Sequence, residues 1–265
     1  MKKHLNKVVI ITGISGGIGQ RTANFLYEKG YKIYGIMRGE FSDERFTCYK
    51  ADVNDYQKIK EIFEDIYQKE KRIDVLINNA GFGIAGAIEN TPPEKIYQIL
   101  NTNLSAVISL MSLAIPYLKE SKGNIINISS VGGIIPLPYQ ACYSASKAGM
   151  EIVSRAIDGE VKSQGVKTTV ILPGDLNTSF TSARVKFTGQ DKDTKEKENH
   201  SIKKMENFEK KGSDPIVVSK AIYKILGQKR PPLRKTVGFG NKLLVFLVRL
   251  LPTRFINFLV RHIYC

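Results

Sequence analysis

The chain of 265 residues is 42% hydrophobic and contains 22 glycines, which suits one large or two small globular domains. Its three cysteines and three histidines are scattered, which excludes a disulfide framework and a metal site and predicts a reducing, cytoplasmic location. The apolar run at residues 8–11 is too short for a signal peptide or a membrane span.

The net charge is +15, and ten of the lysines and arginines follow Asp214, after which the chain contains no acidic residue. The excess charge is therefore concentrated near the C-terminus. The basic residues there lie among aliphatic side chains, and the chain has no nucleic-acid-binding motif. We therefore expect no nucleic-acid partner.

Six apolar segments predict β-strands, and the apolar residues between them recur with helical spacing. The strands are expected at residues 7–12, 31–37, 73–78, 124–129 and 167–172, with a short one that ends at residues 52–53. The helices are expected at residues 17–29, 55–70, 103–119 and 143–165, with a further helix that starts at residues 91–94, where Thr91 is the expected cap.

Alternating strands and helices with short connections predict right-handed crossovers and one parallel sheet. The predicted fold is α/β: a single Rossmann-type, doubly wound parallel sheet with helices on both faces, formed by residues 1–240. Residues 181–212 interrupt the alternation with many charged side chains. They form either a solvated helical excursion or a mobile lid over the substrate site.

Glycines crowd the turn after the first predicted strand, where residues 12–19 read TGISGGIG. Glycine lets the backbone turn sharply and approach a diphosphate, and the following helix offers free N–H groups at its N-terminus. In this strand–turn–helix context the cluster predicts dinucleotide binding.

The residue after the second predicted strand indicates which dinucleotide is bound. An acidic side chain there would hold the ribose hydroxyls of NAD(H), but this chain has Arg38. A guanidinium can bind a 2′-phosphate, so NADP(H) is favoured over NAD(H). The alternative is that Arg38 points to solvent and Glu40 takes the acid's role.

A tyrosine and a lysine lie four residues apart, at Tyr143 and Lys147, and Ser130 precedes the tyrosine by thirteen residues. On a helix, side chains at i and i+4 lie on the same face. A lysine ammonium beside a phenol lowers the phenol's pKa from about 10, so the tyrosine can act as a general acid or base. The trio could move a proton to or from a carbonyl oxygen.

These motifs, in this order and spacing, resemble the short-chain dehydrogenase/reductase family, in its shorter subclass with TGxxxGxG and YxxxK. The resemblance covers residues 7–180 and rests on Thr12, Gly13, Gly17, Gly19, Asp52, Val53, residues 78–81, Asn103, Ser130, Tyr143, Lys147, Pro173, Gly174 and Thr178.

The resemblance implies catalytic roles. Tyr143 would donate the proton, Lys147 would lower its pKa and hold the nicotinamide ribose, and Ser130 would polarise the substrate carbonyl. Asn103 would hold a water that links Lys147 to solvent. Ser129 is the neighbouring alternative to Ser130, but strand alternation puts the two serines on opposite faces.

The resemblance also implies a set of cofactor contacts, which includes Tyr143 and Lys147. The other members are Gly13, Ser15, Gly17, Ile18, Gly19, Arg38, Asp52, Val53, Asn79, Leu176 and Thr178. Asp175 is an uncommon residue in the family's proline–glycine motif, and it either caps the following turn or touches substrate. Relatives usually pair through their two long helices, which implies a homodimer or homotetramer.

Residues 241–265 form a basic, amphipathic extension that Pro252 divides. Its apolar stripe recurs at helical spacing and comprises Leu243, Phe246, Leu247, Leu250, Leu251, Phe255, Phe258 and Leu259. Such helices can lie on an anionic membrane surface. Alternatively the stripe packs on the body of the protein or on a second subunit. The tail also resembles those of family members that act on steroids, retinoids or long-chain lipids.

The sequence thus predicts an enzyme that transfers hydride between NADP(H) and a small-molecule ketone or secondary alcohol. We expect an apolar substrate that is lipid-, steroid- or 3-oxoacyl-like. The alternative is a regulatory or scaffold protein that keeps the fold and binds the cofactor without significant turnover.

Overall fold

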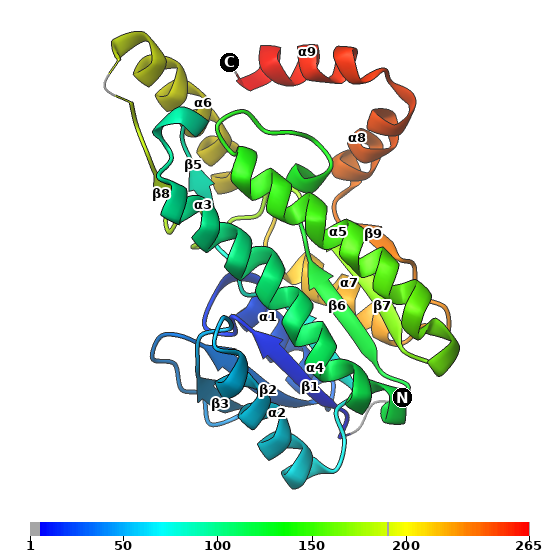
Figure 1. The fold of residues 1–265 in the computed structure, drawn as a ribbon. Helices are drawn as coiled ribbons and strands as arrows, with labels where there is room; N and C mark the ends of the chain where they lie inside the picture. Colours follow the sequence, from blue (N-terminus) through cyan, green and yellow to red (C-terminus); the bar gives the residue numbers. More distant parts are fainter. Residues whose placement is uncertain (1–5, 190, 265) are drawn as a thin grey trace.

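The structure is a computed structural model that describes residues 6–189 and 191–264 (Figure 1). Its centre is a parallel sheet of seven strands in the order β3-β2-β1-β4-β6-β7-β9. The strands are β1 (Val8–Thr12), β2 (Lys32–Met37), β3 (Thr47–Lys50), β4 (Val75–Asn78), β6 (Asn124–Ile128), β7 (Lys167–Leu172) and β9 (Arg234–Thr236). The predicted parallel sheet is confirmed.

Strand β9 has no counterpart in the sequence prediction. Its residues Arg234–Thr236 contain no apolar run, and its position depends on backbone pairing. The Val170 N–H donates to the Leu233 carbonyl at 2.9 Å, and the Val237 N–H donates to the Leu172 carbonyl at 3.0 Å. A short edge strand of this kind depends on its neighbour rather than on its own pattern.

Helices cover both faces of the sheet (Figure 1). Helices α2 (Tyr56–Glu70), α4 (Ala106–Ser121) and α5 (Ala141–Val161) pack their apolar sides over one face, and α1 (Gly17–Glu28) and α7 (Ile216–Leu226) pack over the other. Strand β1 lies in the middle, so its residues contribute to both cores: Val8 and Ile10 to one, and Val9 and Ile11 to the other.

Helix α3 (Pro93–Leu100) continues through a π-helical turn (Asn101–Ser105) into α4. By length and composition this continuous helix, Pro93–Ser121, could cross a membrane. However, Val107, Leu110 and Met111 are buried against the sheet, as in the core helix of a globular domain. The expected cap at Thr91 is wrong: the helix starts after Pro92 without a side-chain cap, and the Thr91 hydroxyl donates to the Ala87 carbonyl at 3.0 Å.

Two further parts lie at the end of the molecule where α5 begins (Figure 1). The segment at residues 181–212 contains helix α6 (Lys192–Lys210) and strand β8 (Val185–Lys186), which pairs with β5 (Ile84–Ala85). The C-terminal segment forms α8 (Phe239–Leu250) and α9 (Thr253–Tyr264). Short 3-10 turns occupy Ile88–Asn90, Val131–Gly133 and Lys162–Gln164.

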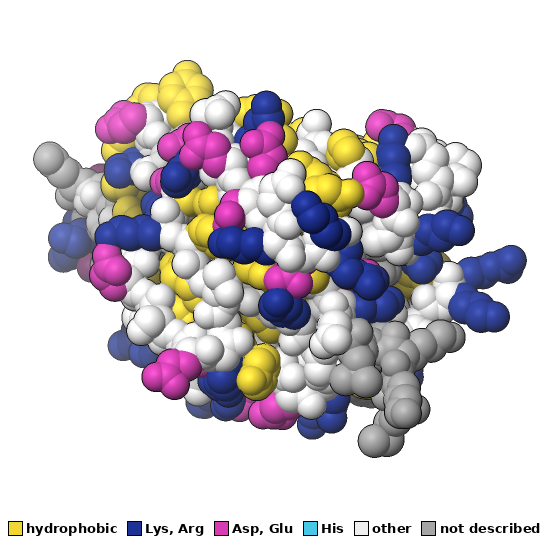
Figure 2. All heavy atoms as spheres, turned by 90° about the horizontal axis from the view of Figure 1, so that it is seen from below, with side chains coloured by type: hydrophobic (Ala, Val, Ile, Leu, Met, Phe, Trp, Pro, Cys, Tyr) yellow, Lys and Arg dark blue, Asp and Glu magenta, His cyan; other side chains and the backbone are white. Residues whose placement is uncertain are grey.

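The two C-terminal helices have a buried side and an exposed side. Val245, Ile256 and Val260 pack against β7 and the loop after β6. Leu251 of the predicted apolar stripe packs on this buried side, and the rest of the stripe lies on the other side, where Phe246 is 57% exposed and Leu250 is 65% exposed. On the face opposite these helices, lysines and arginines are interspersed with acidic side chains (Figure 2).

Candidate active site

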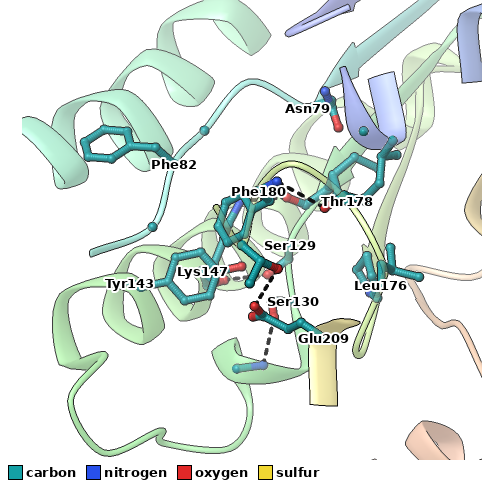
Figure 3. A pocket seen from close by; sticks show the side chains of 18 of the residues that line it. Asn79, Phe82, Ser129, Ser130, Tyr143, Lys147, Leu176, Thr178, Phe180 and Glu209 are labelled. Atoms are coloured by element: carbon teal, nitrogen blue, oxygen red, sulfur yellow. Dashed lines mark hydrogen bonds between the residues drawn. The ribbon is translucent and has the colours of Figure 1, made fainter. Parts of the chain in front are cut away.

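One cavity of about 550 Å³ runs along the edge of the sheet where the strands end. Loops that follow β1, β2, β4, β6 and β7 all contribute to its walls. Carboxyl ends of parallel strands are the usual ligand site in open α/β sheets. The cavity extends from the glycine turn at one end to α6 and α9 at the other (Figure 3).

The glycine turn is shaped to admit a diphosphate. Gly13 and Gly17 have positive φ angles of 67° and 52°, a backbone conformation that favours glycine. Helix α1 starts after Gly16 without a side-chain cap and has no acidic residue in its first turn. Its first N–H groups are therefore open to an anion from the cavity.

Gly19 serves the turn in a different way. A Cβ at this position would lie 2.2 Å from the Gly13 carbonyl oxygen, so only glycine allows α1 to pack this close to the turn. Asn79 braces the same turn, because its Nδ2 donates to the carbonyl oxygens of Thr12 and Gly13, each at 3.0 Å. Asn79 also lines the cavity, whereas Gly19 is not among its lining residues.

Arg38, which follows β2, lines the cavity with a side chain that is 61% exposed. Asp52 lies behind it, with its Oδ2 3.9 Å from Arg38 Nη1, and its Oδ1 accepts from the Asn54 backbone at 2.9 Å. Asp52 is outside the cavity lining, although Val53 is part of it. Glu40 pairs with Lys50 at the surface and is also outside the lining.

Ser130 and Tyr143 meet at the middle of the cavity. The Ser130 hydroxyl lies near the Tyr143 phenol and lowers its pKa, and it accepts a hydrogen bond from the Gly132 N–H at 3.0 Å. Ser129 points elsewhere, because its hydroxyl donates to the Lys147 carbonyl at 2.9 Å. This geometry favours Ser130 over Ser129 as the serine that faces a substrate.

Lys147 is buried beside Tyr143, and its Nζ donates to the Ile128 carbonyl at 2.9 Å. Burial lowers the pKa of Lys147 to about 8. The same burial raises the pKa of Tyr143, and the nearby Ser130 hydroxyl opposes that rise only in part. In the protein without cofactor the Lys147 ammonium donates to Ile128, and the lowering of the Tyr143 pKa by Lys147 stays a prediction.

Asn103 lies in the π-helical turn and is completely buried. Its Oδ1 accepts from the Phe82 N–H at 3.1 Å, and its Nδ2 donates to the Phe82 carbonyl at 2.9 Å. It fixes the loop after β4 and is not among the cavity-lining residues. Gly81 separates it from Lys147, so the proposed water link to Lys147 stays a prediction.

The cavity brings together most of the residues that the sequence singled out. Those that line it are Gly13, Ser15, Gly17, Ile18, Arg38, Val53, Asn79, Ser130, Tyr143, Lys147, Leu176 and Thr178. Gly19, Asp52 and Asn103 lie outside the lining, one step behind residues that form it. No group of three or more metal-ligating side chains occurs in residues 6–189 and 191–264.

Sequence reasoning raised residues 181–212 as a possible lid over the substrate site but named no residue of the walls there. These walls come from the segment after β7, from α6 and from the C-terminal helices, and include Phe180, Met205, Glu209, Asn241, Leu244, Val260, Ile263 and Tyr264. The stripe in the tail was visible in the sequence. The sequence did not show which residues of this tail would face the cavity, because that depends on how α8 and α9 fold back on the body of the protein.

The parallel sheet, the glycine turn and the Ser–Tyr–Lys set define a dinucleotide-binding oxidoreductase. The family model described as short chain dehydrogenase matches residues 7–188. The chain therefore belongs to the short chain dehydrogenase family.

Two curated relatives illustrate the range of this similarity. The chain is 38% identical to a 3-ketodihydrosphingosine reductase of Bacteroides thetaiotaomicron over 236 residues, which cover 88% of each chain. It is 32% identical to a 3-oxoacyl-[acyl-carrier-protein] reductase of Thermotoga maritima, over 66% of this chain and 76% of the relative.

Solved structures have the same fold. A short-chain dehydrogenase from Streptomyces avermitilis aligns with a TM-score of 0.82 and 25% identity, covering 94% of this chain and 93% of that one. A Burkholderia phymatum family member in complex with NAD aligns with a TM-score of 0.80 at 17% identity, covering 94% of each chain.

The buried Lys147 makes stability depend on pH in the protein without cofactor. Its pKa is about 8 in the folded state and 10.5 as a reference, so between these values the unfolded chain binds more protons. The contribution of Lys147 to stability therefore rises with pH above 8 and is lost as pH falls through 8. We expect the unfolding free energy of wild type minus that of Lys147→Met to increase by about 1.5 kcal/mol from pH 8 to pH 9.5, measured by urea denaturation. A constant difference would contradict a titrating buried lysine.

Proposed function

We propose that the protein is an NADP(H)-dependent reductase of ketones, or dehydrogenase of the corresponding secondary alcohols. The observation that carries the proposal is the convergence of Ser130, Tyr143 and Lys147 on the cavity that also holds the glycine turn. The cavity can place a dinucleotide along the strand ends with its reactive end beside Tyr143. When bound, the nicotinamide supplies the hydride that reduces the ketone carbon.

The side chains at the centre of the cavity handle the proton. Ser130 donates a hydrogen bond to the ketone oxygen and holds it next to the phenol. Tyr143 gives its proton to that oxygen as negative charge develops there, and takes it back when an alcohol is oxidised. Lys147, buried and cationic below its pKa of about 8, stabilises the phenolate that remains.

The scaffold alternative is tested by removing the phenol alone. Tyr143→Phe should reduce kcat for ketone reduction by at least about 100-fold, because it removes the proton donor. NADPH binding, followed by cofactor fluorescence, should persist. Tyr97→Phe is the matched control, since Tyr97 is 73% exposed and remote from the cavity lining. If neither the wild type nor the Tyr143→Phe variant reduces any ketone, the result would instead favour the scaffold alternative.

We assign the preference for NADP(H) to Arg38. Its guanidinium lines the cavity after β2, and the potential acid Glu40 lies outside the lining. The Asp52 Oδ2 lies 3.9 Å from Arg38 Nη1, beyond hydrogen-bond distance, so Asp52 can steady the guanidinium and leave its N–H donors available to a 2′-phosphate.

Arg38→Ala should raise the KM for NADPH by about 10- to 100-fold, because charge-assisted hydrogen bonds to a 2′-phosphate are lost. The KM for NADH should change little. Steady-state oxidation of both cofactors measures the effect, and Arg155→Ala, an exposed arginine on α5, is the control. Equal changes for the two cofactors would contradict the assignment.

The substrate end of the cavity favours an apolar molecule. Phe180, Leu244, Val260 and Ile263 contribute to its walls. The names of the two relatives described above identify 3-ketodihydrosphingosine and 3-oxoacyl-[acyl-carrier-protein] as the compounds that those proteins reduce. A ketone on a long aliphatic chain fits these walls.

We further propose that α8 and α9 dock on an anionic membrane surface. Large apolar side chains are exposed along both helices, and they are Leu243, Leu244, Phe246, Leu247, Leu250, Phe255, Phe258, Leu259 and Ile263. The same segment carries Lys242, Arg249, Arg254 and Arg261 and no acidic residue. Apolar exposure together with one sign of charge matches an anionic lipid surface.

The protein should sediment with phosphatidylserine-containing vesicles and much less with neutral phosphatidylcholine vesicles. Replacing Phe246, Leu250 and Phe258 together by Ser should weaken anionic vesicle binding by at least about 10-fold, since each loses buried apolar area. The control is Ile88→Ser, whose side chain is 57% exposed in the turn Ile88–Asn90, outside α4, α5 and the C-terminal helices. Lipid docking would be contradicted if the triple variant bound anionic vesicles as well as the wild type does. It would also be contradicted if the triple variant lost dimerisation but kept its vesicle binding.

Association of two or four chains through α4 and α5 stays a prediction, as does the cytoplasmic location. Ile108 on α4 and Ile152 on α5 are exposed and would lie in such an interface. The C-terminal helices lie at the end of the molecule where α5 begins (Figure 1), which leaves most of this surface open.

A further inference from the structure

Asp175 follows the proline–glycine pair after β7, and its side chain lines the cavity. Sequence reasoning favoured a turn-capping role. However, no hydrogen bond or salt bridge joins its carboxylate to any other residue in the described ranges, so capping does not explain it. Burial raises the pKa of Asp175, the nearby charge of Glu209 raises it further, and the charge of Arg184 lowers it. A carboxylate that lines the cavity without a hydrogen-bonded partner is available to a cationic group.

Glu209, on the last turn of α6, also lines the cavity, next to Ser130 and Tyr143 in Figure 3. Its two oxygens are held in place: one contacts Arg184 Nη2, and the other accepts from the Thr181 hydroxyl at 2.7 Å. The Arg184 side chain is 1% exposed, and its Nε and Nη1 have no hydrogen-bond partner. Arg184 therefore balances Glu209 from behind and is itself outside the cavity lining.

The backbone fixes these two carboxylates relative to each other. The Ser213 N–H donates to the Asp175 carbonyl at 3.1 Å, and the Asn177 N–H donates to the Ser213 carbonyl at 3.1 Å. A Cβ at Gly212 would lie 2.5 Å from the Asp175 carbonyl oxygen, so the chain after α6 is packed tightly on this loop. Neither carboxylate can leave the cavity without separating these segments.

The charges at the substrate end therefore sum to about one negative charge. Arg184 offsets Glu209, which leaves Asp175. The basic side chains that line the described cavity are Arg38, at the opposite end, and Lys147, which is bonded to Ile128. Asp175 is an exposed residue at the edge of this cavity, and apolar side chains such as Leu176 and Phe180 line the cavity beside it.

We propose that Asp175, with Glu209 beside it, binds a protonated amino group that the substrate carries next to its ketone. The aliphatic chain of the substrate then lies along Leu244, Val260 and Ile263. The inference rests on the proposed ketone reductase function and specifies its substrate as a long-chain 2-amino ketone. Asp175 and Glu209 act here as specificity-determining residues, and the charge of Glu209 also raises the pKa of Tyr143.

Two substrates and one isosteric variant test the proposal. Wild type should reduce a long-chain 2-amino-3-ketone with a kcat/KM at least about 10-fold above that for the 3-ketone of equal length without the amine. Asp175→Asn should remove this advantage by raising the KM for the amino ketone, with the plain ketone unaffected. Because Asp175 has no partner to lose, the variant should fold normally.

Glu209→Gln should act in the same direction, and Glu206→Gln on the same helix is its control, because Glu206 pairs with Lys186 away from the cavity. Equal reduction of both ketones by wild type and by Asp175→Asn would overturn the inference while the proposed function stands. Failure of wild type to reduce either ketone with NADPH would overturn both.

Discussion

Two buried hydrogen bonds join Lys147 to the end of strand β6, one through its ammonium and one through its backbone carbonyl. Lys147 Nζ donates to the Ile128 carbonyl, and the Ser129 hydroxyl donates to the Lys147 carbonyl. These bonds fix α5 against the sheet at the level of the cavity. Tyr143, one turn earlier on α5, is consequently held opposite Ser130, which follows β6. The placement of Tyr143 opposite Ser130 is therefore a result of how one helix packs on one strand.

The same packing of α5 on β6 sets where the Lys147 ammonium points in the protein without cofactor. Spacing on a helix correctly places Tyr143 and Lys147 on one side, but it does not say which acceptor the ammonium chooses. In the structure the ammonium bonds a backbone carbonyl, and burial dominates both pKa values. A bound dinucleotide would add anionic and hydroxyl groups near Lys147 and so change this balance.

Local patterns were sufficient for much of the fold and for the cofactor half of the site. Continuous apolar runs identify the central strands, and glycine spacing identifies the turn after β1. The failures share a cause. Strand β9 has no apolar pattern, Thr91 bonds backward instead of capping, and Asp175 faces a cavity that exists only after α6 and α9 fold over it. Each depends on contacts between segments distant in sequence.

The same few turns of the C-terminal helices α8 and α9 form part of the cavity wall and part of the exposed apolar surface. Val260 lines the cavity and Phe258 is exposed two residues earlier, while Leu244 and Ile263 are both lining and exposed. A small rotation of α9 about its axis would therefore alter the shape available to a substrate and the hydrophobicity presented outside together. One short segment therefore shapes both the cavity and the exposed apolar surface, so a substitution in it that changes one would change the other.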